Sequence, residues 1–242
     1  KTSYEIMPSL VGSEMCIRDR FLFLATFFFL KFCQYIYHNI LLRILNDIIY
    51  YQKQLMELIF YLEKLKKAGF NWLALGVESG SKYVRDGVEK GRFNDLDIVK
   101  TTNKIKQHGI YIIANYIFGL PDDTNSSMQE TLNLALEINA EWANFYCAMA
   151  YPGSPLYERA KALDMPLPDN PDGPGWIGYS QHGYDSLPLQ TDILSSQEVL
   201  DFRDAAFEKY FSDPSFLNMT KEKFGLPVVD HIKSMMRVKL KL

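Results

Sequence analysis

The feature that most constrains this chain is a unit of helix, short loop and apolar strand that occurs three times within residues 55–150. In the first unit, apolar residues recur at helical spacing until Gly69, a helix stop signal. The run at residues 71–79 (NWLALGVES) is then continuously apolar, which is typical of a strand buried on both faces. Similar runs follow at residues 110–119 and 142–150. Repeated units of this kind predict an α/β fold with a parallel sheet and right-handed crossovers, in either a barrel or an open sheet.

Capping signals predict where the later helices begin. Ser126 and Gln129 have the spacing of a capping box and predict the start of the helix before the third strand. Ser195 and Glu198 have the same spacing beyond the strands, and Pro214 is at the favoured first position of another helix. We therefore expect a helical extension after the sheet.

In parallel α/β sheets, ligands bind beyond the carboxyl ends of the strands. Glu78 lies at such an end, where a carboxylate is costly unless it is paired or used. It could cap the next helix or pair with Arg85, or it could accept hydrogen bonds from two adjacent hydroxyls such as a ribose diol. These two interpretations are equally supported. Asn115, inside the second predicted strand, is either a satisfied core amide, which we favour, or a donor that lines a pocket.

Charge and cysteine content exclude several functional classes. The chain has 29 acidic and 26 basic residues, a net charge of −3, which gives no reason to expect a nucleic-acid partner. Its three cysteines lack zinc or redox spacing and form no even disulfide framework, so we expect a reducing, cytoplasmic location. The four histidines are scattered. In the tail, an aromatic and polar group could contact substrate, although packing is favoured: Trp176, Tyr179, His182 and Tyr184.

Residues 1–52 differ in composition from the rest of the chain. Residues 8–20 (PSLVGSEMCIRDR) resemble a translated sequencing-library adapter. Of the 32 residues from 21 to 52, 18 are Phe, Ile, Lys, Asn or Tyr, whose codons are rich in A and T. The apolar run 21–30 is shorter than the roughly 20 residues that span a membrane. We interpret residues 1–52 as artefactual and expect no membrane association, with a signal anchor as the alternative.

Three further segments carry a family resemblance. They are residues 76–81 (GVESGS) followed by 89–91 (EKG), residues 115–124 (NYIFGLPDDT) and residues 151–157 (YPGSPLY). Their order and spacing resemble the radical S-adenosylmethionine enzymes, in particular the subgroup that often carries a cobalamin-binding domain upstream. The resemblance implies a partial TIM barrel of six βα units, of which the three predicted strands would be the last three.

The resemblance also implies cofactors and site residues. Glu78 and Ser79 would contact the ribose or amino group of S-adenosylmethionine. Asn115 joins the cofactor-binding candidates because of its place inside the second predicted strand. The resemblance further implies that Ile117 and Gly119 pack near the adenine, and that the turn at Tyr151 and Pro152 closes the floor of the site. The family holds a [4Fe–4S] cluster with Cys-x3-Cys-x2-Cys, a triplet that this sequence does not contain.

We therefore expect three parts: residues 1–52, residues 53–160 as the C-terminal half of a radical S-adenosylmethionine barrel, and residues 161–242 as the helical extension. The expected function is that of an enzyme fragment that binds S-adenosylmethionine and a small-molecule substrate but is inactive as written. Cobalamin use by the parent enzyme follows only from the subgroup. The alternatives are a non-catalytic α/β binding module and a protein anchored in a membrane by residues 21–45.

Overall fold

The computed structural model describes residues 55–87 and 98–237. Contacts divide the chain into two compact units, Lys1–Leu58 and Ile59–Leu242. Of the first unit, the structure describes only residues 55–58. Residues 1–52, on which the artefact and membrane-anchor hypotheses rest, lie outside the described residues, and the three predicted parts stay predictions. Within the described ranges, every helix is too short or too polar to cross a bilayer.

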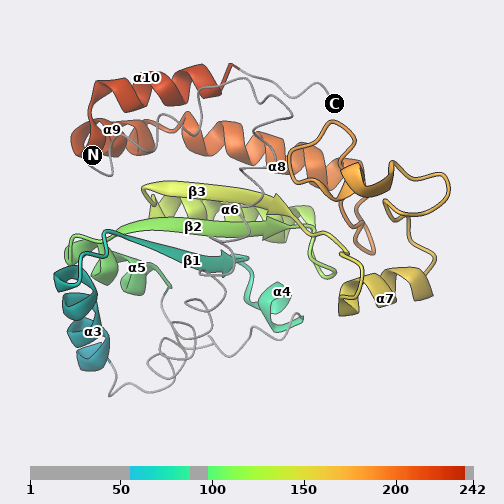
Figure 1. The fold of residues 1–242 in the computed structure, drawn as a ribbon, viewed down its shortest axis with the longest axis horizontal. Helices are drawn as coiled ribbons and strands as arrows, with labels where there is room; N and C mark the ends of the chain where they lie inside the picture. Colours follow the sequence, from blue (N-terminus) through green and yellow to red (C-terminus); the bar gives the residue numbers. More distant parts are fainter. Residues whose placement is uncertain (1–54, 88–97, 238–242) are drawn as a thin grey trace. The chain divides into compact units, whose positions relative to one another are not determined.

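The second unit contains a parallel sheet of three strands in the order β1-β2-β3 (Figure 1). The strands are β1 (Trp72–Glu78), β2 (Tyr111–Phe118) and β3 (Trp142–Cys147). Each lies within one of the three predicted apolar runs, so the predicted α/β class and the parallel arrangement are confirmed. The carboxyl ends of all three strands therefore meet at one edge of the sheet.

Helices precede and connect the strands and continue to the end of the described chain. A first set alternates with the strands along the chain: α3 (Leu55–Lys67) precedes β1, α4 (Lys82–Gly87) and α5 (Ile98–Gln107) lie between β1 and β2, and α6 (Asn125–Ile138) connects β2 to β3. The extension after β3 contains α7 (Pro155–Ala162), the 3-10 helix η3 (Gly175–Tyr179), α8 (Ser196–Phe211), α9 (Pro214–Phe224) and α10 (Leu226–Met235). The predicted helical extension is thus present.

The capping predictions had mixed outcomes. Ser195 and Glu198 form the expected capping box at the start of α8, and Pro214 is the first residue of α9. The prediction for α6 was wrong, because its capping box is formed by Thr124 and Ser127. Thr124 is the residue with the extended backbone (φ −125°, ψ 167°) that an N-cap requires, and Ser127 takes the place of the usual Glu or Gln three residues later.

The two faces of the sheet differ in burial. Along β2, Ile112, Ala114, Tyr116 and Phe118 are buried, whereas the alternate residues are only partly buried. The buried face packs against helices, with Phe145 of β3 stacked on Tyr116 (5.3 Å between ring centroids). The expectation of strands buried on both faces was therefore wrong: the alternation shows that the described helices cover one face completely and leave the other, here called the half-exposed face, accessible.

A buried ion pair closes the amino end of the sheet. The side chain of Glu141, just before β3, is fully buried and accepts a hydrogen bond from the Ile112 N–H (2.8 Å). It also pairs with Lys223 of α9. On the same helix, Phe224 stacks on Trp72, with ring centroids 5.9 Å apart. These contacts bind the extension to the start of the strands.

Candidate functional site

The carboxyl end of β1 is bulged and places a carboxylate over the half-exposed face. Glu78 has a left-handed backbone (φ 66°), and the register with β2 shifts between Gly76 and Glu78. A Cβ atom on Gly76 would lie 2.7 Å from Glu78 Oε1, so the carboxylate folds back over the glycine. A left-handed non-glycine residue costs about 1–3 kcal/mol, and such residues are enriched at active sites and ligand-binding positions. Gly76 is in register with Asn115, so the folded-back Glu78 carboxylate and Asn115 lie over the same face.

Ser79 has a structural position in the turn after β1. Its side chain is fully buried, and its hydroxyl lies 3.1 Å from Thr131 Oγ1 on α6. The Gly80 N–H donates to the same Thr131 oxygen (2.8 Å), and Arg85 donates to the Ser79 carbonyl (2.6 Å). The turn that carries Glu78 is thereby attached to α6.

A chain of side-chain hydrogen bonds crosses the half-exposed face. The Trp142 indole N–H donates to Asn144 Oδ1 (3.0 Å), and Asn144 Nδ2 donates to Asn115 Oδ1 (2.9 Å). Asn115 Nδ2 in turn donates to the Leu75 carbonyl (3.3 Å). An indole N–H can only donate and a carbonyl can only accept, so the two ends of this chain determine the orientation of both amides. Among the described residues, each amide has a second N–H with no partner, which could donate to a ligand.

The end of β2 carries the predicted adenine contacts. Ile117 is partly buried on the half-exposed face. Gly119 has a φ of 77°, and a Cβ there would lie 2.5 Å from Val199 Cγ1, so α8 packs directly on this glycine. In the following loop, buried Asp123 accepts hydrogen bonds from the Leu120 N–H (3.0 Å) and the Ser127 hydroxyl (2.5 Å). Burial raises the pKa of Asp123, and these hydrogen bonds partly offset that rise.

The turn after β3 is exposed and aromatic. Tyr151 and Pro152 are exposed, and the Tyr151 ring stacks on Tyr179 with centroids 5.7 Å apart. The Tyr179 hydroxyl donates to Asp169 (2.6 Å). Trp176 packs beside Tyr179 (5.7 Å) and is 75% exposed. The tail residues singled out from the sequence are therefore divided: Trp176 and Tyr179 lie beside the turn of Tyr151.

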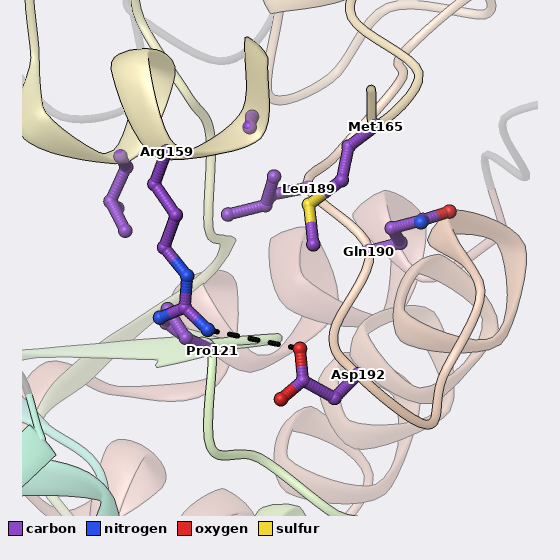
Figure 2. Close-up of a pocket in the computed structure, with 8 residues that line it drawn as sticks. Pro121, Arg159, Met165, Leu189, Gln190 and Asp192 are labelled. Atoms are coloured by element: carbon purple, nitrogen blue, oxygen red, sulfur yellow. Dashed lines mark ion pairs between the residues drawn. The ribbon is translucent and has the colours of Figure 1, made fainter. Parts of the chain in front are cut away.

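The other two tail residues lie apart from that group. Tyr184 is exposed, and His182 lines a cavity beside β3. A second, very small cavity, about 10 Å³, lies between α7 and the segment before α8, where Arg159 and Asp192 form an ion pair (3.7 Å; Figure 2). It has room for about one water molecule and is too small for a cofactor.

Sequence reasoning missed three residues of the site. Trp142 and Asn144 complete the amide chain, and Thr131 holds the turn after β1. Asn144 had a visible signal, because it is a second amide inside an apolar strand. Its partnership with Asn115 depends on the register of β2 and β3, which a single sequence does not show.

The described residues do not fit an iron–sulfur cluster. No group of three or more His, Cys, Asp or Glu side chains with metal-binding geometry occurs among them. Cys147 is the cysteine they contain; it is buried, and its burial raises the pKa of the thiol to about 12. A thiol in that state is a poor iron ligand, because iron binds the thiolate.

Comparisons with known proteins give one family match and several relatives. Residues 43–135 match the Radical SAM superfamily. An uncharacterized methyltransferase of Pyrococcus horikoshii is 31% identical over 176 residues, 72% of this chain and 36% of that protein. The anaerobic magnesium-protoporphyrin IX monomethyl ester cyclase of Rubrivivax gelatinosus is 24% identical over 67% of this chain and 28% of its own length.

A tRNA-2-methylthio-N(6)-dimethylallyladenosine synthase of Psychrobacter cryohalolentis is 29% identical over 119 residues, 48% of this chain and 22% of that enzyme. The chain thus spans about a third or less of the length of these relatives. The superfamily has a partial TIM-barrel fold, and the three parallel strands agree with it. The resemblance drawn from the three motifs is confirmed: the chain carries a region of the radical S-adenosylmethionine superfamily.

Proposed function

We propose that the carboxyl ends of β1, β2 and β3 bind S-adenosylmethionine as part of a radical enzyme. The observation that carries this proposal is the position of the Glu78 carboxylate, which is folded over Gly76, the register partner of Asn115. A carboxylate that can accept hydrogen bonds from two hydroxyls therefore lies over the same face as the Asn115 amide, and the described helices leave this face accessible. Ligands of parallel α/β folds bind at this end of the strands.

Each predicted site residue receives a role in this proposal. Glu78 accepts hydrogen bonds from the ribose hydroxyls, and Asn115 donates its second N–H to the cofactor. Ser79 holds the turn through Thr131, because its hydroxyl is bonded within the protein. Ile117 packs against the adenine, while Gly119 lets α8 approach the end of β2. Tyr151 and Pro152 form the floor of the site.

When bound in a complete enzyme of this superfamily, S-adenosylmethionine supplies a 5′-deoxyadenosyl radical after reductive cleavage. The residues of this chain bind and orient the cofactor and exclude water from it. We further propose that the chain as written does not cleave the cofactor, because its sequence has no Cys-x3-Cys-x2-Cys triplet. Anaerobic reconstitution that gave a stoichiometric iron–sulfur absorbance would contradict this second statement.

The reaction of the whole protein is proposed only as a class: radical modification of a small-molecule substrate. The relatives are named as an uncharacterized methyltransferase, a magnesium-protoporphyrin IX monomethyl ester cyclase and a tRNA-2-methylthio-N(6)-dimethylallyladenosine synthase, so their names do not select one reaction. Use of cobalamin stays a prediction from the subgroup resemblance.

Calorimetric titration with S-adenosylmethionine tests the binding proposal. We expect submillimolar binding by the full chain and a loss of at least tenfold in Glu78→Gln, because one charge-assisted hydrogen bond contributes about 1.5–3 kcal/mol. Glu137→Gln, on the exposed surface of α6, is the matched control and should bind like the unmodified chain. No binding by the unmodified chain, or equal binding by Glu78→Gln, would overturn the proposal.

A further inference from the structure

A cavity of about 380 Å³ runs along the outer edge of β3. The strand forms one wall from Trp142 to Tyr146, and α8 forms the opposite wall, with Phe207 and Asp204 among its lining residues. Met235, at the end of α10, also lines it. Its volume lies within the range of 300–1,000 Å³ that is usual for pockets binding small molecules. The cavity shares Trp142 and Asn144 with the amide chain of the half-exposed face, but Glu78 and Ile117 are not among its lining residues.

The strand edge in this cavity offers backbone hydrogen-bonding groups. The Ala148 N–H donates to the Phe118 carbonyl (2.7 Å), so the backbone groups of Cys147 point away from β2. The backbone N–H and C=O groups of successive residues point alternately to the two edges of a strand. The N–H and C=O groups of Phe145 and Ala143 therefore point to the same outer edge as those of Cys147. Within the described part of the chain, the N–H and C=O of Phe145 have no hydrogen-bond partner at this edge. Such unpaired edge groups bind other polar groups readily.

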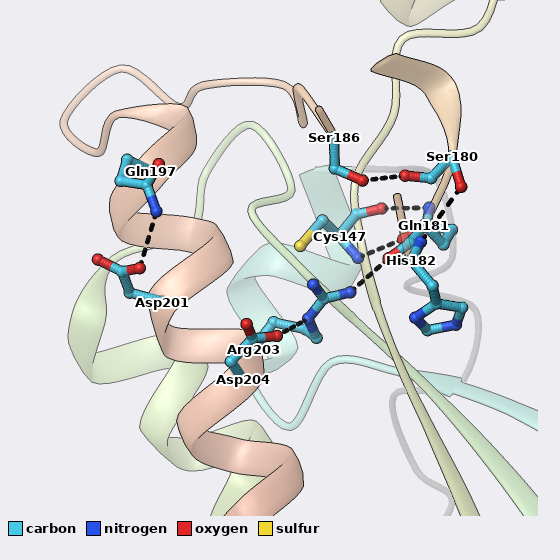
Figure 3. Close-up of polar contacts among 9 residues, drawn as sticks. All are labelled: Cys147, Ser180, Gln181, His182, Ser186, Gln197, Asp201, Arg203 and Asp204. Carbon is cyan, nitrogen blue, oxygen red and sulfur yellow. Dashed lines mark hydrogen bonds and ion pairs between the residues drawn. The ribbon is translucent and has the colours of Figure 1, made fainter. Parts of the chain in front are cut away.

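The protein itself shows what chemistry fits this edge. The Gln181 side-chain amide pairs with both backbone groups of Cys147: its Oε1 accepts the N–H (3.0 Å) and its Nε2 donates to the carbonyl (2.9 Å; Figure 3). Arg203 holds this arrangement, because its buried guanidinium donates to the backbone carbonyl of Gln181 (2.6 Å) and to the Asp204 carboxylate (2.5 Å). One planar amide thus satisfies both the N–H and the C=O of one edge residue, Cys147. The corresponding N–H and C=O of Phe145 lie two residues earlier, where Phe145 lines the cavity.

We propose that this cavity binds a neutral planar primary amide or lactam whose donor and acceptor pair with the backbone N–H and C=O of Phe145. The apolar ring that carries the amide, or that contains the lactam, would pack against Phe207 and Met235. The charges disfavour an anionic ligand, since Asp204 and Glu208 line the cavity and the cation among the lining residues, Arg203, is already bound to Gln181 and Asp204. The proposal does not depend on binding of S-adenosylmethionine.

Two matched probes test this proposal. The ring system of 2-quinolinone carries the N–H and C=O of a lactam, whereas 2-methoxyquinoline has a similar shape without the donor. Benzamide tests the primary amide. In chain labelled with ¹⁵N-phenylalanine, the Phe145 N–H resonance should shift with 2-quinolinone and benzamide, and 2-methoxyquinoline should bind about tenfold more weakly because it loses a hydrogen bond. The Phe145→Leu variant identifies the resonance.

The Phe207→Ala variant removes the apolar wall and should weaken 2-quinolinone binding by about tenfold. Ile193→Ala, at a side chain that is 66% exposed outside the cavity, is the control and should leave binding unchanged. Equal affinity for 2-quinolinone and 2-methoxyquinoline, or no shift at Phe145 at millimolar probe, would overturn the proposal. Binding of only one of the two amide classes would identify which source of this chemistry fits the cavity.

Discussion

The amino end of the sheet and its half-exposed face use polar side chains differently. At the amino end, Glu141 is buried and its bonds run to the Ile112 N–H and to Lys223, within the protein. Midway along β2 and β3, the amides of Asn115 and Asn144 are oriented by protein contacts, and each has an N–H with no partner among the described residues. The buried charge therefore stabilises the fold, whereas the preorganised amides of the half-exposed face are available to a ligand.

The largest expected effect lies at the amino end. Lys223→Met leaves the Glu141 carboxylate buried without its cation, and breaking such a pair costs about 3 kcal/mol of unfolding free energy when one partner is partly exposed. Lys221→Met, at an exposed position of the same helix, should change stability by less than about 0.5 kcal/mol. Urea denaturation of both variants measures the difference. Equal stabilities would show that the amino end is not held by this pair.

An intermediate effect is expected where the turn of Glu78 joins α6. Thr131→Val conserves shape but removes the oxygen that accepts the Gly80 N–H and contacts the Ser79 hydroxyl. Leaving such groups unpaired costs about 2 kcal/mol. Thr102→Val is the control, because buried Thr102 donates only to the Val99 carbonyl in its own helix. If both variants lost the same stability by thermal unfolding, the turn would not depend on Thr131.

The smallest stability effect is expected on the half-exposed face. Asn144→Ala interrupts the amide chain but leaves its neighbours accessible to water, so the unfolding free energy should fall by only about 1 kcal/mol. Asn133→Ala, at an exposed position of α6, should leave the unfolding free energy unchanged or raise it slightly, because alanine favours the helix. A loss in Asn144→Ala as large as that in Lys223→Met would contradict the assignment of this face to ligand binding.

Sequence reasoning recovered the strands because each is a continuous apolar run between helical segments. It identified Glu78 and Asn115 because a polar residue inside such a run is conspicuous. It missed the contact of Asn144 with Asn115, which requires the register between β2 and β3. It also missed the pair of hydrogen bonds between the Gln181 side chain and the backbone of Cys147, which joins two segments 34 residues apart in the sequence. Local patterns therefore predicted elements, and the long-range pairings that shape the site needed the structure.

We expect S-adenosylmethionine to bind at the carboxyl end of the half-exposed face. Methyl NMR of the full chain labelled at isoleucine tests it directly, because β2 carries isoleucines on both faces. Titration with S-adenosylmethionine should shift the methyl signal of Ile117, which lies at the carboxyl end of the half-exposed face, and leave that of buried Ile112 unchanged. Shifts absent at Ile117, or equal at both residues, would contradict the account.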